Sequence, residues 1–137
     1  MTIPKAKPEL IEKYKDLKDL RDKIYNWLIL NCADKKVKNL QTKFYIGFNS
    51  TSIRKLVSGN AGETKLLCLT AIVDIVKQGE LMHVDVDKKK RREILAVYFF
   101  KSSVQINDLN YHYWFTVRQL TNGNFIYSGN LDIKKPF

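Results

Sequence analysis

Cysteine and histidine are scarce in this 137-residue chain, which has two of each. Cys32 and Cys68 lie in apolar segments and form neither a CxxC motif nor the Cys/His spacing of a zinc site. We therefore predict two buried free thiols in a reducing compartment, and neither a disulfide nor a catalytic pair. The acidic residues are scattered along the chain, so the sequence predicts no metal site and no cofactor.

Long apolar runs and targeting signals are missing as well. No stretch reaches the roughly 18 uncharged apolar residues that a membrane-spanning helix needs. The segment from Pro8 to Lys23 is charged throughout, which excludes a signal peptide there, so we expect a cytoplasmic protein. The glycine-containing segment at residues 58–62 lacks the GK[ST] ending of a nucleotide-binding loop. With 45% hydrophobic residues and no internal repeat, residues 1–137 fit a single globular domain.

Positive charge is abundant: the chain has 24 basic and 14 acidic residues, a formal net charge of +10. Such a balance favours a polyanionic partner, which here means RNA, with tRNA as one candidate, or an acidic protein such as an immunity protein. The densest basic run comprises Lys88, Lys89, Lys90, Arg91 and Arg92. It fits a loop that contacts phosphates, and it equally fits a solvated hairpin tip that discourages edge pairing.

Three segments follow one another in the expected secondary structure. Apolar residues at helical spacing predict a lead helix over residues 8–32. Residues 42–79 combine a short strand with two helices, and the second helix ends at Gly79. Residues 81–132 show strand patterns separated by turn residues, so we expect an antiparallel sheet that ends in a three-strand meander. The predicted class is α+β, with N-terminal helices packed on a four- to five-stranded antiparallel sheet.

The most informative pattern lies on the second strand of this meander. Strand alternation places His112, Thr116 and Arg118 on one face, with apolar side chains on the other. A symmetric turn before the strand brings Lys101 opposite Thr116, and a two-residue Asn-Gly loop after it brings Tyr127 opposite Arg118. These five residues are therefore expected to share one surface. A register slip of a single residue would separate them.

These side chains suit RNA cleavage without a metal ion. The reaction needs a base near the 2′-hydroxyl, a cation for the phosphorane charge and an acid for the leaving oxygen. His112 can act as base or acid near neutral pH, while Arg118 and Lys101 can hold the phosphate. The hydroxyls of Thr116 and Tyr127 can donate to it. Sheet faces also carry these residue types for β-propensity alone, and that interpretation stays open.

One further aromatic residue belongs to the candidate surface, and a second histidine lies outside it. Trp114 shares the face of His112 and offers a ring on which a base can stack. His83 lies in the strand expected over residues 81–86, where a lone histidine is more often structural than functional.

The order of several short motifs is distinctive. They are Thr42 to Phe48, Ser52 to Leu56, Val97 to Phe100, Tyr111 to Arg118 and Gly123 to Tyr127. Over about residues 15–132 this order resembles the small domains attached to large polyvalent proteins of phages and conjugative elements. Those domains are grouped with the barnase–EndoU–colicin–RelE-like (BECR) nuclease fold, and many members of that fold are RNA-cleaving toxins.

The resemblance implies helices packed on a sheet that binds RNA on its open face. Lys55 matches a lysine of the family pattern in the short helix. A histidine often follows shortly after, where this chain has Ser58 and Gly59. The expected function is therefore a metal-independent, toxin-like ribonuclease in which His112 substitutes for the missing histidine. The alternative is a non-catalytic module of a mobile element that binds nucleic acid or an acidic protein as an inhibitor or regulator.

Overall fold

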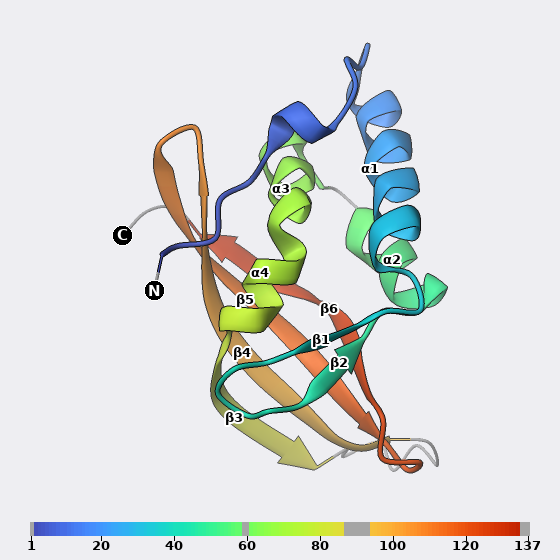
Figure 1. Ribbon diagram of the computed structural model, residues 1–137, viewed down its shortest axis with the longest axis vertical. Helices are drawn as coiled ribbons and strands as arrows, with labels where there is room; N and C mark the ends of the chain where they lie inside the picture. Colours follow the sequence, from blue (N-terminus) through green and yellow to red (C-terminus); the bar gives the residue numbers. More distant parts are fainter. Residues whose placement is uncertain (1, 59–60, 87–93, 135–137) are drawn as a thin grey trace.

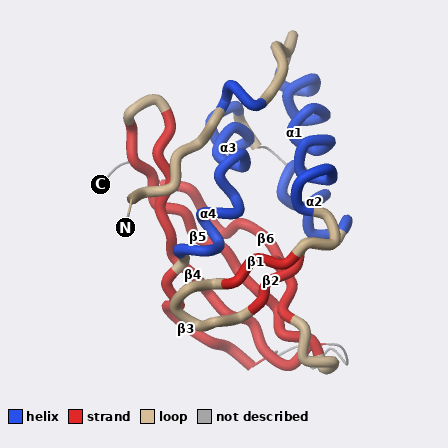
Figure 2. The backbone as a smooth tube through the Cα atoms, viewed as in Figure 1, coloured by secondary structure: helices blue, strands red, loops and turns tan. Residues whose placement is uncertain are grey.

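Four helices pack against one face of a six-stranded sheet in the part of the chain that is described (Figures 1 and 2). The computed structural model describes residues 2–58, 61–86 and 94–134. The helical elements are η1 (Pro8–Leu10), α1 (Leu17–Cys32), α2 (Ser50–Val57), α3 (Glu63–Cys68), η2 (Leu69–Ala71) and α4 (Ile72–Gln78). The strands are β1 (Lys36–Lys38), β2 (Tyr45–Gly47), β3 (Glu80–Val86), β4 (Ile94–Ile106), β5 (Leu109–Leu120) and β6 (Phe125–Lys134).

The sheet order is β1-β2-β6-β5-β4-β3. Strands β4, β5 and β6 form the expected antiparallel meander, and the α+β class is confirmed. The sheet has one strand more than the sequence predicts, because β1 forms in a lysine-rich segment expected to be a loop. It pairs with β2 in a hairpin, and β2 runs parallel to β6. The short parallel contact between β2 and β6 joins the first half of the chain to the meander.

The lead helix is shorter than residues 8–32, since α1 begins at Leu17. The Asp16 side chain accepts a hydrogen bond from the backbone N–H of Asp19 at 2.8 Å, as an N-cap does. Asp19 in turn accepts from the backbone N–H of Lys15 at 2.9 Å. These side chains satisfy backbone donors at the start of α1, and the chain before it forms only the short turn η1.

The helix expected over residues 63–78 is divided into α3, η2 and α4. The break lies at Thr70, whose hydroxyl donates to the carbonyl of Leu67 at 2.7 Å. The same hydroxyl accepts the backbone N–H of Lys7 at 2.7 Å. The helix break therefore anchors the N-terminal segment, which runs on beside the end of β4 (Figure 1).

The core lies between the helices and one face of the sheet. On β5, Tyr113, Phe115 and Val117 are 0% exposed and belong to one apolar cluster with buried residues of the four helices. Burial of each such side chain stabilises the fold by roughly 1.5–3 kcal/mol. The helices therefore occupy one side of β5 and leave its other side for different contacts. None of the helices in the described residues is long and apolar enough to cross a membrane.

Candidate nucleic-acid interface

The sheet face turned away from the core is called the outer sheet face here. Its side chains alternate with the buried ones of β5, and directly paired residues on neighbouring strands share a face. From β3 and β4 it includes Glu80, His83, Asp85, Val97, Phe99, Lys101 and Ser103. From β5 and β6 it includes His112, Trp114, Thr116, Arg118, Ile126 and Ser128. All predicted catalytic residues except Tyr127 lie on this face.

The β4–β5 hairpin turns more tightly than predicted. Asn107 and Asp108 form its two-residue turn with φ angles of 51° and 64°, which suits a primed turn. As a result Lys101 pairs with Trp114 and not with Thr116, and Ser103 pairs with His112. The predicted register is wrong by two residues. Because side chains alternate with a period of two, the shift leaves Lys101 on the predicted face.

The β5–β6 loop is one residue longer than predicted. Leu120 pairs with Asn124, with a 2.8 Å hydrogen bond from the backbone N–H of Leu120 to the carbonyl of Asn124. Gly123 has a φ of 89°, which only glycine adopts readily, and its N–H donates to the carbonyl of Leu120 at 2.9 Å. The three-residue loop places Ile126 opposite Arg118. This one-residue shift moves Tyr127 to the other face of the sheet.

Tyr127 lies in the core, so its predicted place on the outer sheet face is wrong. It pairs with Val117, is 0% exposed and has its hydroxyl 3.1 Å from the Tyr113 hydroxyl. Its ring stacks on Phe48 and Phe115, at centroid distances of 5.2 Å and 5.4 Å. Burial, with the neighbouring Tyr113 hydroxyl, raises the pKa of Tyr127 well above its usual value. Its hydroxyl is therefore held neutral within the core.

The outer sheet face meets two cavities. The first, of about 320 Å³, lies where β3 begins beside β4 and is bordered by the N-terminal residues 2–4. Lys101, Ser103, His112 and Glu80 line it. We call it the upper cavity. It brings together two of the predicted catalytic residues, Lys101 and His112.

The second cavity, of about 210 Å³, lies between α2 and the far end of β5 and β6; we call it the lower cavity. Lys55 and Thr51 of α2 line it together with Arg118 and Ser128. Tyr127 borders it from the core side. The structure therefore places Lys55 and Arg118 at the same cavity, a relation that strand alternation alone does not predict.

Lys101 and His112 of the upper cavity form an aromatic and cationic cluster with Trp114. The Lys101 ammonium lies 5.5 Å from the centroid of the Trp114 ring, within cation–π range. The His112 ring lies 5.5 Å from the same ring, tilted by 48°. Thr116 is only 8% exposed, and its hydroxyl donates to the Gly129 carbonyl at 3.4 Å. Trp114 therefore carries cationic and aromatic neighbours, while Thr116 is bound to the sheet backbone.

The distance between the two cavities is much larger than one phosphate group. His112 and Arg118 are six residues apart on β5, which corresponds to about 20 Å along a strand. Both cannot contact one phosphodiester at the same time. The predicted catalytic set is therefore divided between two neighbouring sites on one surface.

Sequence reasoning did not identify Asp85 as a site residue. It is hydrogen-bonded to His83 on the outer sheet face. The signal is their spacing: two residues apart on a strand, they share a face. Lys88, Lys89, Lys90, Arg91 and Arg92, which were predicted to bind nucleic acid, lie outside the described residues. Within the described residues no three histidine, cysteine or acidic side chains gather in a possible metal site.

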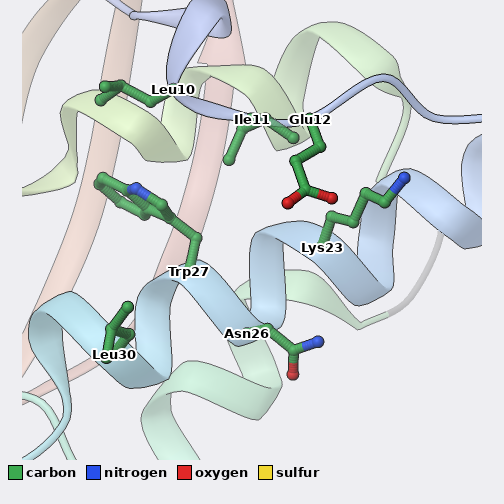
Figure 3. A pocket seen from close by; sticks show the side chains of 7 residues that line it. All are labelled: Leu10, Ile11, Glu12, Lys23, Asn26, Trp27 and Leu30. Carbon is green, nitrogen blue, oxygen red and sulfur yellow. The ribbon is translucent and has the colours of Figure 1, made fainter.

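A third hollow, of about 250 Å³, lies on the helical side of the molecule (Figure 3). Leu10 and Ile11 of the N-terminal segment face Trp27 and Leu30 of α1 across it. Leu30 is 78% exposed there. This hollow holds none of the predicted site residues.

The fold and the site define a class of protein: an α+β domain whose open sheet face carries cationic and aromatic side chains. The model of the family of large polyvalent protein-associated domain 3 matches residues 15–127, so the chain belongs to that family. No match was found among curated proteins or among solved structures.

Proposed function

We propose that this domain binds RNA on its outer sheet face and cleaves it without a metal ion, as a toxin-like ribonuclease of the BECR type. The observation that carries the proposal is that Lys55 and Arg118 both line the lower cavity. Two cations from different elements line one small cavity, and Thr51 and Ser128 add hydroxyl groups. This combination is suited to a phosphate group.

The sequence-distant origin of these groups favours a binding role. Asn49 caps α2 by accepting the backbone N–H of Ser52 at 2.7 Å, which fixes the helix start at the cavity. Thr51 and Lys55, four residues apart, then lie on the same side of α2. Arg118 faces the cavity from β5 and can offer two parallel donors to phosphate oxygens.

The proposed reaction is internal transesterification. The 2′-oxygen attacks the phosphorus, the bond from phosphorus to the 5′-oxygen breaks, and a 2′,3′-cyclic phosphate forms. One group takes the 2′-hydroxyl proton and one supplies a proton to the 5′-oxygen. Arg118 and Lys55 stabilise the negative charge of the phosphorane. In this arrangement Lys101, His112 and Trp114 hold nucleotides that flank the scissile phosphate.

Membership of the polyvalent-protein-associated family supports a biological setting for the proposal. A ribonuclease domain of a polyvalent protein from a mobile element acts in the bacterial cytosol, where tRNA is an accessible substrate. The net charge of +10 supports an RNA partner, and it equally supports an acidic immunity protein that covers the same face.

The second candidate is a nucleic-acid-binding module without catalysis. The cluster of Lys101 and His112 around Trp114 favours it, because an aromatic ring beside cations binds single strands without any reaction. In this case both histidines are dispensable for function.

One experiment separates the two candidates. The purified protein is incubated with total RNA and with tRNA in EDTA, and binding is followed by fluorescence anisotropy. We expect cleavage by the wild type and an at least about tenfold slower reaction for Arg118→Ala and for Lys55→Ala. Lys77→Ala, on the exposed side of α4, is the matched control and should behave as wild type. RNA that is bound but intact supports the module; RNA neither bound nor cleaved refutes both candidates.

A further inference from the structure

His83 and Asp85 form a hydrogen-bonded pair on strand β3. The Nε2 atom of His83 lies 2.6 Å from Oδ1 of Asp85. The carboxylate accepts the proton on Nε2, so the lone pair of the neutral imidazole is on Nδ1. The histidine ring thus has a fixed orientation and a basic nitrogen.

A β-bulge turns this pair toward the outer sheet face. Leu81 pairs with Phe100 on the core side, and regular alternation would place His83 on the core side as well. The register shifts between Leu81 and His83, so that His83 pairs with Phe99 instead. The two rings are in contact, with centroids 5.5 Å apart. Bulges often re-aim a side chain beside a functional site.

Asp85 lies level with Arg118 across the sheet, and His83 lies level with Thr116, two residues away along β5. Asp85 pairs with Val97, and Val97 pairs with Arg118. Two strand spacings correspond to about 10 Å, and the two-residue offset along the strand puts the backbone of His83 about 12 Å from that of Arg118, against about 20 Å for His112. His83 is therefore closer than His112 to the cation that is proposed to hold the phosphate.

A purely structural role does not account for the pair. The side chains of His83 and Asp85 are 60% and 39% exposed. A hydrogen-bonded pair so open to solvent contributes little to the stability of a fold. The exposed ring is instead accessible to a bound ligand.

We infer that His83, oriented by Asp85, is the proton-transfer residue for the phosphodiester held by Arg118 and Lys55. The inference rests on the proposed function. Nδ1 of His83 takes the proton of the 2′-hydroxyl, the 2′-oxygen bonds to phosphorus, and the bond from phosphorus to the 5′-oxygen breaks. The 5′-oxygen takes a proton from water, and the hydroxide so formed takes the proton from the His83 imidazolium, which regenerates the neutral ring. Asp85 is the positioning residue, since it holds the ring and stabilises the imidazolium. His112 then binds and does not transfer the proton.

The test uses a short single-stranded RNA under single-turnover conditions in EDTA. Binding is measured in parallel with the 2′-deoxy version of the same strand, which lacks the attacking hydroxyl. We expect His83→Ala to slow cleavage by about 100-fold or more and to leave binding unchanged. Added imidazole should restore part of the lost rate. Asp85→Asn should slow cleavage about tenfold without imidazole rescue, and Asp74→Asn on α4 serves as the matched carboxylate control.

Each outcome decides the inference. A His83→Ala protein that cleaves at the wild-type rate overturns it and leaves the proposed function standing. Loss of binding together with cleavage in His83→Ala also overturns it, because His83 would then be a binding residue. A wild type that leaves the RNA intact refutes the proposed reaction and this inference together.

Discussion

Strand β5 presents two different surfaces to the molecule. Tyr113, Phe115 and Val117 are 0% exposed and pack against helices. Trp114 and Arg118, on the opposite face, are half-buried, and Arg118 lines the lower cavity. Neighbouring residues on β5 thus have different surroundings: one set packs in the core, and the other lies on the outer sheet face. Substitutions on the two faces should therefore have separable effects on stability and on RNA.

The largest effect is expected on the core face. Phe115→Ala should lower the free energy of unfolding by about 3–5 kcal/mol, because it leaves a cavity among stacked rings. Phe115 lies 5.1 Å from Phe100 and 5.4 Å from Tyr127, measured between ring centroids. Urea unfolding followed by circular dichroism measures the loss. Lys101→Ala, on the outer sheet face, should change stability by less than about 0.5 kcal/mol. Equal losses in both variants would remove the distinction between the faces.

The next effect belongs to the outer sheet face. Arg118→Ala and Lys55→Ala should each weaken RNA binding about tenfold while stability stays unchanged. If both contact one phosphate, the double variant should lose less than the sum of the two single losses in binding free energy. Each single variant should also reduce the salt dependence of binding by about one phosphate contact. Additive losses would show that the two side chains bind different phosphates.

A smaller effect is expected for Tyr127, which lies in the core and borders the lower cavity. Tyr127→Phe removes one hydroxyl of the buried pair with Tyr113 and should cost about 1 kcal/mol of unfolding free energy. Because the hydroxyl lies in the core, RNA cleavage and binding should remain at wild-type levels. An RNA-cleavage assay beside urea unfolding measures both. A slower reaction at unchanged stability would restore Tyr127 to the catalytic set.

The meander of β4, β5 and β6 shows which features of the fold the sequence predicts and why it does not predict the others. Strand alternation was accessible, since Lys101, His112 and Arg118 share the face that the sequence predicts. The face of Lys101 was correct because the hairpin error was two residues, an even number. The face of Tyr127 was wrong because the loop error was one residue. Turn geometry, which depends on which residues adopt positive φ, decided both results.

Contacts between distant segments were beyond reach for another reason. Lys55 and Arg118 line the same cavity because β2 runs parallel to β6 and α2 then packs on β6. No local pattern encodes that parallel pairing. His83 faces outward only because of a bulge, and a bulge leaves no periodic signal in the sequence. The elements were therefore predictable from the chain, while the assembly of the candidate site was not.

The smallest expected effect is the pH dependence of folding stability that arises from the two buried cysteine thiols. Burial raises the pKa of Cys68 to about 12 and that of Cys32 to about 11, from a usual value of 9.0. Above the usual value the unfolded chain releases thiol protons that the folded chain retains, so folding stability falls as pH rises. At pH 9 the loss is about 0.4 kcal/mol per thiol, and it vanishes near pH 7.

Urea unfolding at pH 7 and pH 9 measures this loss, with Cys68→Ala as the comparison. The variant should lose about half as much stability as the wild type over this range, because only Cys32 remains. An unchanged pH dependence would contradict the burial of the Cys68 thiol as its cause. A thiol reagent at pH 8 should label both cysteines only after unfolding, since both side chains are buried on the core side. Protection of both thiols in the folded protein would show that reagents in solution do not reach the core side, whereas His83 and Asp85 on the outer sheet face are exposed to solvent.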